Sequence, residues 1–410
     1  MRFIADFHIH SKYSRATSPQ MEVKTLSEVA KLKGISLLGT GDFTHHLWLE
    51  ELKDVLKDSG NGFFGYNGVN FILTGEISSI YSKGGKVRKI HNVIFAPSFD
   101  IVDKINAALS GYGNLSSDGR PIIGIDAKDL AEVLFSISNK IFLVPGHIWT
   151  PWFSLYGSKS GFDSIEECFE EYAKDIYALE TGLSSDPGMN WRWSKLDRFN
   201  LISNSDSHSP QKIGREANVF DVEMSYKGVI DALKVKDNRK FLHTIEFFPE
   251  EGKYHYDGHR NCNVRSDPKE TKKNKNICPV CGKPLTVGVM SRVDELADRP
   301  EGYVPEKSVP YKRMIPLSEI ISDVLGVGDS SKAVGKEYSA IIPRVGTELE
   351  VLTEVREDEL LKKLPQKIAK AIINVRSGNV NILPGFDGEY GKIEILKKDE
   401  AAGEKQMDLF

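Results

Sequence analysis

The chain has 410 residues, of which 40% are hydrophobic and 27% are charged. It is long enough to bury a large core and to form two or three domains. The formal net charge of -4 excludes the uniformly basic composition of many nucleic-acid-binding proteins, but it is compatible with a local basic surface. No stretch approaches the roughly 18 consecutive apolar residues of a membrane-spanning helix, and no cleavable leader is recognised. We therefore expect a cytoplasmic, nucleoid-associated protein without a membrane partner.

Short apolar runs rich in branched side chains predict strands through the first 205 residues. They cover residues 3–7, 36–40, 71–77, 90–96, 141–145, 176–179 and 201–204. A helix is predicted over 21–33, because Leu26, Val29 and Ala30 have helical spacing and Gly34 is a suitable C-terminal stop. Alternation of strands and helices predicts an α/β fold. We expect a distorted, TIM-like barrel of about seven β/α units over residues 1–248, with an open doubly wound sheet as the alternative.

The composition changes after Pro249. Residues 249–300 are polar, rich in turn formers and contain three of the four cysteines, so they predict a small separate module. Residues 301–396 predict a mixed, largely helical region that contacts DNA, and the helical spacing within 317–324 favours core packing there. Residues 397–410 are expected to form a flexible tail.

Histidines and carboxylates stand at the ends of the predicted strands. After the first strand, His8 and His10 share one face of the extended chain, while Phe7 and Ile9 point the other way. The remaining candidates, on later strands, are Asp42, Glu76, His91, His147, Asp206 and His208. Because the C-terminal ends of barrel strands meet at one rim, we expect these side chains to converge. His91, which opens its strand, fits this placement least well.

This mixture of imidazoles and carboxylates is typical of two or three closely spaced divalent metals, such as Zn, Mn, Mg or Fe. Glu76 could bridge two of them, and bound metals lower the pKa of water to give hydroxide near neutral pH. The pattern predicts metal-assisted hydrolysis of a phosphate ester with Asp206, Glu76 and His147 as catalytic residues. His45 and His46 are either further ligands or solvated loop residues.

The series DFHIH, GTGDF, GEI, IHNV, PGH and SDSH resembles the motif set of the polymerase and histidinol phosphatase (PHP) superfamily over about residues 1–245. The resemblance implies a distorted seven-unit barrel with a two- or three-metal cluster on its rim. It assigns as ligands His8, His10, Glu76, His91, His147, Asp206 and His208. The family often has a histidine where this chain has residues 13–15, and another where it has Phe43. Asp42 is therefore expected either to bind a metal or to stand behind a ligand.

A second set of metal ligands lies in the cysteine-containing module. His259 and Cys262 are followed by Cys278 and Cys281 in a CPVCGKP turn, which resembles a zinc knuckle. Four ligands predict one structural zinc, with His255 as a rival for the fourth position and unliganded thiols as the alternative. Residues 253–313 hold thirteen Lys or Arg against eight Asp or Glu, so this module either contacts phosphates or presents a solvated basic surface.

The chain ends in Gln-Met-Asp-Leu-Phe. This run resembles the QxxLF pentapeptide by which bacterial repair and replication proteins bind the ring-shaped sliding clamp. The resemblance assigns clamp binding to Gln406, Leu409 and Phe410. The two apolar residues would enter a pocket of a clamp of the bacterial β type.

Together these features indicate DNA, rather than a small phosphate, as the substrate. The barrel motifs combined with HxxC and CPVCGKP resemble the endonuclease Q family. That resemblance implies cleavage of the phosphodiester 5′ to a deaminated base (uracil, hypoxanthine or xanthine) or an abasic site, leaving 3′-hydroxyl and 5′-phosphate ends. Two alternatives remain: a small-molecule phosphatase of the histidinol phosphatase type, and a noncatalytic, clamp-bound DNA adaptor.

Access to a damaged base requires its extrusion from the duplex into a pocket with aromatic walls. The aromatic loop 147–156 predicts such a pocket, with Trp149 and Trp152 as candidate contacts, unless these rings pack under the rim. Arg215 or Lys212 is expected to stabilise the developing phosphoryl charge.

Overall fold

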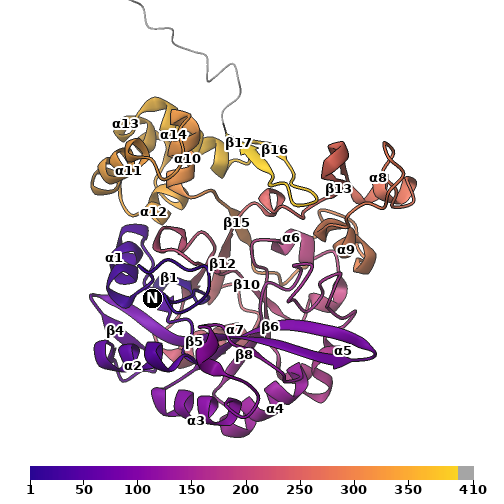
Figure 1. Ribbon diagram of the computed structural model, residues 1–410. Helices are drawn as coiled ribbons and strands as arrows, with labels where there is room; N and C mark the ends of the chain where they lie inside the picture. The colour runs from indigo at the N-terminus through magenta and orange to yellow at the C-terminus, as the bar shows by residue number, and fades with distance from the viewer. Residues whose placement is uncertain (396–410) are drawn as a thin grey trace, which may run out of the picture.

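The computed structural model describes residues 1–395 and shows a mixed α/β protein built on one large central sheet (Figure 1). The strands of this sheet are β1 (Arg2–Asp6), β2 (Leu37–Gly39), β3 (Lys57–Asp58), β4 (Phe64–Tyr66), β5 (Val69–Lys83), β6 (Lys86–Ala96), β7 (Ile122–Ile123), β8 (Phe142–Pro145), β11 (Ala217–Asp221), β12 (Phe241–Glu246) and β15 (Tyr311–Arg313). A separate parallel pair consists of β9 (Ala178–Glu180) and β10 (Asn200–Ile202). Each strand predicted from the sequence is confirmed, with boundaries that differ by several residues.

Helices connect these strands along the chain. They are α1 (Val23–Lys33), α2 (His46–Val55), α3 (Phe99–Leu109), α4 (Ala127–Ile137), α5 (Ile165–Phe169), α6 (Pro187–Asn190) and α7 (Tyr226–Lys234). The prediction for α1 is confirmed: Leu26 and Ala30 are buried, and Gly34 ends the helix in the left-handed conformation with φ 84°. A Cβ atom at Gly34 would lie 2.4 Å from the hydroxyl oxygen of Thr347, so close packing also requires glycine there.

The central sheet is not a simple series of parallel β/α units. Strands β1, β2 and β5 are parallel, but β5 and β6 form an antiparallel hairpin with no helix between them. Its turn, Gly84–Gly85, has positive φ angles of 61° and 72°, which suit a two-residue hairpin. Strand β11 is also antiparallel to β1. The Gly-Gly turn was the sequence signal for this departure.

The alternation at the end of β1 places polar and apolar side chains as predicted. Phe7 and Ile9 are buried in the core, where the ring of Phe7 packs 5.3 Å from that of Phe95. His8 and His10 are buried on the other side among polar groups. The first strand therefore anchors the site to the apolar core.

The cysteine-containing module packs against the first 248 residues, which we call the N-terminal unit. Its elements are β13 (Asp257–His259), β14 (Val264–Ser266), α8 (Pro268–Lys273) and α9 (Val289–Leu296). Arg292 of α9 is buried and donates hydrogen bonds to the backbone oxygens of Tyr156 and Phe162. The module is thereby fixed against the aromatic loop that follows β8. The chain then returns to the central sheet, where β15 pairs with β12.

The remaining helices form a bundle, which we call the helical unit, above α1 in Figure 1. They are α10 (Leu317–Leu325), α11 (Lys332–Val345), α12 (Glu348–Thr353), α13 (Glu357–Lys363) and α14 (Gln366–Arg376). The core role predicted for 317–324 is confirmed, because Leu317, Ile320 and Ile321 are fully buried. A buried ion pair connects the helical unit to α1: Lys33 Nζ lies 3.3 Å from Glu348 Oε2.

The last described segment divides the C-terminal region differently from our prediction. A hairpin of β16 (Asn381–Leu383) and β17 (Lys392–Glu394) leaves the helices and packs on the cysteine-containing module, where Gly385 N–H donates to Glu250 O. The predicted clamp-binding residues Gln406, Leu409 and Phe410 lie outside the described residues. Within residues 1–395, no helix is long and apolar enough to cross a membrane.

Candidate metal centre and active site

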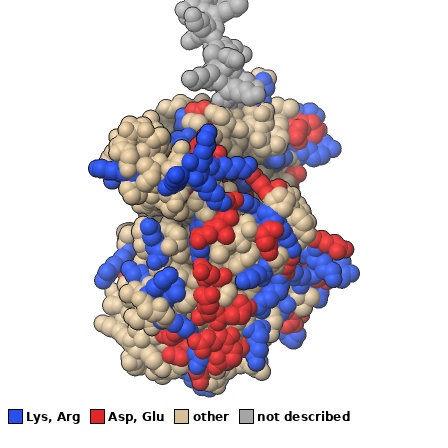
Figure 2. All heavy atoms as spheres, turned by 90° about the vertical axis from the view of Figure 1, so that its right-hand side faces the viewer, with Lys and Arg blue, Asp and Glu red and all other residues tan. Residues whose placement is uncertain are grey.

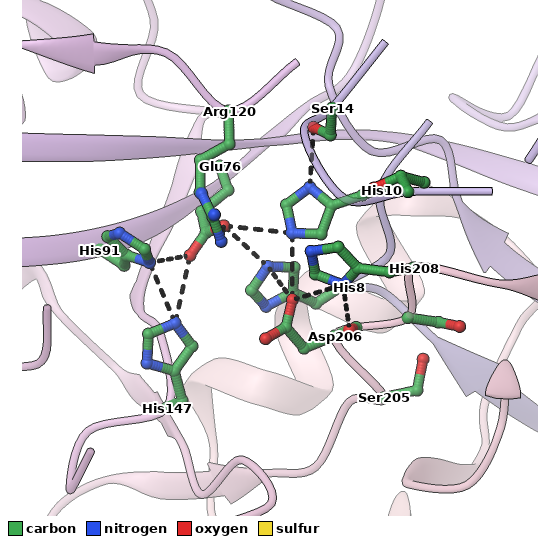
Figure 3. A network of polar contacts seen from close by, with 12 residues as sticks. His8, His10, Ser14, Glu76, His91, Arg120, His147, Ser205, Asp206 and His208 are labelled. Atoms are coloured by element: carbon green, nitrogen blue, oxygen red, sulfur yellow. Dashed lines mark hydrogen bonds and ion pairs between the residues drawn. The ribbon is translucent and has the colours of Figure 1, made fainter. Parts of the chain in front are cut away.

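Two groups of metal-ligating side chains meet at one end of the central sheet (Figure 3). The first group is His8, His10, Glu76 and Asp206, and the second is Glu76, His91 and His147. In each group the potential ligand atoms lie within 4.8 Å of one another. Because both groups contain Glu76, this carboxylate stands between two adjacent cation-sized sites.

The distances around Glu76 show how it is shared. One oxygen, Oε1, lies 2.6 Å from His91 Nδ1 and 3.2 Å from His147 Nε2. The other oxygen, Oε2, lies 3.3 Å from the Nε2 atoms of both His8 and His10. Asp206 Oδ1 completes the first group, 3.0 Å from His10 Nε2.

The topology explains the placement of His91. Glu76 and His91 are not at strand ends, since β5 and β6 both extend well past them; they face each other across the hairpin, with Ser78 paired to His91. Because β6 runs antiparallel to β5, its first half lies at the end of the sheet where the parallel strands finish. The antiparallel hairpin thus brings His91 to the same site.

Two buried carboxylates stand behind the histidines of β1. Asp42 Oδ1 lies 3.0 Å from His10 Nδ1, and its other oxygen accepts hydrogen bonds from the N–H and hydroxyl of Ser11. Glu180, at the end of β9, lies 3.0 Å from His8 Nδ1 and accepts from the N–H of His147 at 2.9 Å. A carboxylate at Nδ1 holds the proton there and leaves Nε2 free for a metal.

The sequence prediction missed Glu180. Its signal was present, because it follows a predicted strand as Asp42 does. Asp42 and His208 belong to neither group of potential ligands among the described residues. The ring of His208 is tilted against that of His10, with centroids 4.5 Å apart, and His208 Nδ1 donates a hydrogen bond to Asp206 O at the edge of the first group.

Three of the predicted site residues have strained backbone. The φ angles of Asp42, His147 and Asp206 are 50°, 27° and 46°. Side-chain-bearing residues rarely adopt this left-handed region, and such strain is concentrated at functional sites. The surrounding hydrogen bonds hold these residues where their side chains reach the cluster.

The site is a mutually stabilised set of charges. Burial raises the pKa of Glu76, but the neighbouring His91, His8 and Arg120 outweigh it and hold the pKa well below the usual range of a carboxyl group. Asp206 is likewise held well below its usual pKa, against burial, by His10 and His8. Both carboxylates are therefore ionised at neutral pH, as metal ligands must be.

The residues that we predicted to contact DNA differ in their exposure and in their hydrogen-bond partners. Trp149 is only 1% exposed and donates a hydrogen bond to Asn190, which agrees with the alternative that this ring packs under the rim. Trp152 is 42% exposed. Arg215 donates twice to Ser205 O, and Lys212 is paired with Glu319 and Asp329.

A cavity of about 480 Å³ lies between the aromatic loop and the cysteine-containing module. Its lining includes Thr150, Trp152, Phe153, Tyr254 and Tyr390. The ring of Phe153 lies 4.9 Å from that of His91, and Thr150 Oγ1 lies 3.2 Å from His147 Nδ1. The cavity therefore adjoins the second group of ligands.

The second predicted metal site is also assembled in space. His259, Cys262, Cys278 and Cys281 place four ligand atoms within 4.8 Å of one another, and His255 is not among them. Burial opposes ionisation of Cys278, yet N–H groups of the knuckle outweigh it and lower the pKa of this thiol to about 7. Cys168 is a buried core residue.

The α/β fold and the shared cluster of histidines and carboxylates define the class of metal-dependent hydrolases. Two solved structures cover the whole chain at 34% identity. The crystal structure of the lesion-specific endonuclease from Pyrococcus furiosus gives a TM-score of 0.87, covering 100% of this chain and 98% of that chain. An endonuclease Q complex with a 27-mer duplex carrying an abasic lesion at the active site gives 0.86, covering 100% of both. The chain belongs to the endonuclease Q family.

Two curated relatives have no assigned activity. The uncharacterized protein YqxK of Bacillus subtilis is 31% identical over 96% of this chain and 99% of its own length. The uncharacterized protein MJ0043 of Methanocaldococcus jannaschii is 39% identical over 60% of this chain, which spans only 31% of that protein. The family model described as the MJ0043 C-terminal domain matches residues 316–379, within the helical unit.

Proposed function

We propose that this protein is a metal-dependent DNA repair endonuclease that cuts the phosphodiester 5′ to a deaminated base or an abasic site. The observation that carries the proposal is the pair of ligand groups sharing Glu76. Family membership supports DNA as the substrate, because a related endonuclease Q holds a duplex with an abasic lesion at its active site.

The residues fit two divalent metals. His8 Nε2 is buried without a hydrogen-bond partner among the described residues, although an imidazole nitrogen is a good metal ligand. We assign His8, His10, Glu76 and Asp206 to one metal and Glu76, His91 and His147 to the other. When bound, Zn, Mn or Mg ions would polarise the phosphoryl group and supply hydroxide at neutral pH.

The chain's own residues would position the reaction. In hydrolysis, a hydroxide oxygen forms a bond to phosphorus, the bond from phosphorus to the 3′ oxygen breaks, and that oxygen takes a proton. The products are a 3′-hydroxyl and a 5′-phosphate. Asp42 and Glu180 hold protons on the Nδ1 atoms of His10 and His8, and so keep both rings oriented. Asp206, 27% exposed, marks the open side of the cluster where DNA would approach.

We further propose that the central sheet closes as the distorted barrel of the PHP superfamily. A parallel bridge between Ile9 and Ser207 brings the chain after β10 beside the chain after β1. On the other side, Ile148 N–H, following β8, donates to Glu180 O at the end of β9. The pair β9–β10 thus connects the end of β8 with the end of β1.

The cavity beside His91 is the proposed pocket for the extruded base. Trp152 and Tyr254, with ring centroids 5.9 Å apart, offer aromatic surface at its wall. Thr150 supplies a polar group between the cavity and His147. Stacking on such rings is sequence-tolerant, which suits recognition of several damaged bases.

The cysteine-containing module is proposed to hold one structural zinc and to contact the phosphate backbone. Its four ligands leave no open position for chemistry. Lysines at 269, 272, 273 and 275 are exposed on and just after α8. Figure 2 views the molecule from the side of α5, α8 and α9, and shows Lys and Arg side chains on the upper part of this face above a stripe of Asp and Glu. The acidic stripe would repel DNA, so the phosphate backbone of the DNA would contact only the upper part of this face.

The clamp-binding proposal rests on the sequence of the tail. Gln406, Leu409 and Phe410 match the QxxLF pattern, and the residues before them would serve as a tether. A bacterial β-type sliding clamp is the proposed partner, and it would concentrate the enzyme on DNA.

The test is incision of labelled duplexes that carry uracil, hypoxanthine, an abasic site or no lesion, with Mg²⁺ or Mn²⁺. The wild type should make a single cut just 5′ of each lesion and none in the undamaged duplex. Asp206→Asn should lose activity by more than about 100-fold, since even residues behind the ligands typically contribute 10 to 100-fold. Asp129→Asn, on the exposed surface of α4, is the matched control and should cut normally.

Two results would contradict the proposal. Hydrolysis of a small phosphomonoester without any cleavage of DNA would identify a phosphatase. Full metal loading with neither activity would identify a noncatalytic DNA adaptor.

A further inference from the structure

One permanent cation stands inside the cluster and has no part in metal binding. Arg120 Nη1 lies 3.4 Å from Glu76 Oε2, and Figure 3 shows its side chain alongside Glu76, above the two groups. The side chain is 28% exposed, so the guanidinium is accessible from the open side. A guanidinium carries five N–H donors, and this long contact uses one of them.

The loop that carries Arg120 is fixed on both sides. Gly119 N–H donates to Tyr13 O, and Pro121 O accepts from Ser78 N–H of β5. A Cβ atom at Gly119 would lie 2.3 Å from Asp42 Oδ2 and 2.4 Å from Ser14 Oγ. The backbone at Gly119 therefore packs so closely against these two residues that a side chain has no room there. Arg120 is therefore positioned by the same residues that orient His10.

A positive charge at this position is energetically unfavourable in the metal-loaded site unless an anion binds next to it. Two divalent metals bound by the groups around Glu76 would repel a guanidinium that contacts the shared carboxylate. A residue needed only to hold metals would not be an arginine. A phosphodiester bound beside Arg120 would offset this repulsion, because its negative oxygens would accept hydrogen bonds from the guanidinium and would also be suitable ligands for the metals.

The cations that we predicted for this role are already engaged. Lys212 Nζ lies 2.6 Å from Glu319 and 3.2 Å from Asp329, so its charge is neutralised by the helical unit. Arg215 uses two N–H groups on Ser205 O. Among the described residues, Arg120 is the arginine that contacts a ligand group, and the 3.4 Å contact with Glu76 Oε2 is its one side-chain hydrogen bond.

We propose that Arg120 binds the nonbridging oxygens of the scissile phosphate and stabilises the negative charge that grows on them during hydrolysis. This inference rests on the proposed phosphodiesterase function. The planar fork of N–H groups matches two phosphoryl oxygens, and its charge acts where the bond from phosphorus to the 3′ oxygen breaks. Arg120 is thus a catalytic residue that contacts substrate rather than a support for Glu76.

The first experiment compares Arg120→Ala and Arg120→Lys with the wild type on an abasic duplex. We expect kcat/KM to fall by about 100 to 1,000-fold in Arg120→Ala, the range for loss of one transition-state donor. Arg120→Lys should keep only part of the wild-type kcat/KM, because lysine has the positive charge but not the planar pair of N–H donors. Added guanidinium ions should raise the rate of Arg120→Ala and leave the wild type unchanged. Arg239→Ala, an exposed and distant ion-paired arginine, is the control.

The second experiment separates substrate binding from support of Glu76, and it needs no DNA cleavage. Mn²⁺ affinity should be unchanged or higher in Arg120→Ala, while inorganic phosphate should bind the Mn²⁺-loaded variant at least tenfold more weakly than the wild type. Loss of Mn²⁺ binding, or equal phosphate affinity, would overturn the inference. Failure of the wild type to cut any duplex would instead refute the proposed function, and the phosphate measurement would still decide the role of Arg120.

Discussion

The two candidate metal sites of this protein are built in opposite ways. In the N-terminal unit, 196 positions separate His10 from Asp206, and the ligands come from five places: the segment after β1, β5, β6, and the segments after β8 and β10. In the cysteine-containing module, 22 positions separate His259 from Cys281, and all four ligands belong to short turns and a small hairpin. The first site is therefore a product of the whole fold, and the second is a product of local sequence.

The surroundings of the two metal sites also differ, in burial and in the support of the ligands. His8, His10 and Glu76 are nearly inaccessible and rest on a large apolar core, and Asp42 and Glu180 orient the two histidines. Around the zinc ligands, most residues from 269 to 284 are exposed. We therefore predict that the N-terminal unit keeps its geometry without metal, whereas the module needs its proposed zinc in order to fold.

The largest expected effect tests that dependence. Removal of zinc, by a strong chelator or by Cys278→Ser, should unfold the module, because a structural zinc contributes on the order of 10 kcal/mol of folding free energy. Trypsin should then cut rapidly at the lysines after α8, while the N-terminal unit stays resistant. Cys168→Ala, which alters the cysteine outside the module, should retain one zinc and the slow digestion pattern. A module that remained protected without metal would remove the contrast between the two sites.

The N-terminal unit should respond to protons more than to chelators. Burial raises the pKa of Glu246, at the end of β12, to about 8 from 4.5 in the unfolded chain. The folded state thus holds the proton more tightly, so this stabilisation is complete below about pH 4.5 and is lost as the pH rises through about 8.

Glu246→Gln keeps a neutral side chain beside Thr181 and Thr244 and should remove this pH dependence. Urea midpoints measured from pH 5 to pH 9 should fall in the wild type and change less in the variant. The exposed substitution Glu132→Gln should keep the wild-type slope. Parallel slopes in wild type and Glu246→Gln would show that the buried carboxyl does not control stability.

The smallest effect concerns the support of the ligands. Glu180→Gln keeps the shape of the side chain but weakens the acceptor at His8 Nδ1 and at His147 N–H. Such a change typically reduces activity or metal affinity by about 10 to 100-fold, with the fold retained. Incision rates as a function of Mn²⁺ concentration measure it. An unchanged rate would mean that the strands alone, without Glu180, hold the geometry of the first group.

The sequence predicted much of this architecture because its signals are local. Apolar runs gave the strands, the spacing of Leu26 and Ala30 with Gly34 gave α1, and the spacing of His259, Cys262, Cys278 and Cys281 gave the second metal site. Strand-end positions and the motif resemblance together identified all members of the two groups around Glu76, although Glu76 and His91 lie inside longer strands. These predictions needed only periodicity, turn chemistry and ligand type.

Only the tertiary structure decided the rest, because it depends on which distant segments meet. The antiparallel direction of β6 brings His91 to the cluster, and the position of β9, next to β8 and β10, places Glu180 behind His8. Burial separates Trp149 from Trp152, although both lie in one aromatic loop. No sequence pattern distinguishes a functional arginine from the other arginines of the chain. The role of Arg120 was therefore recognised only from its contact with Glu76 in the structure. The sequence by itself determined the elements and the ligand types, and three-dimensional contact decided which side chains share a site.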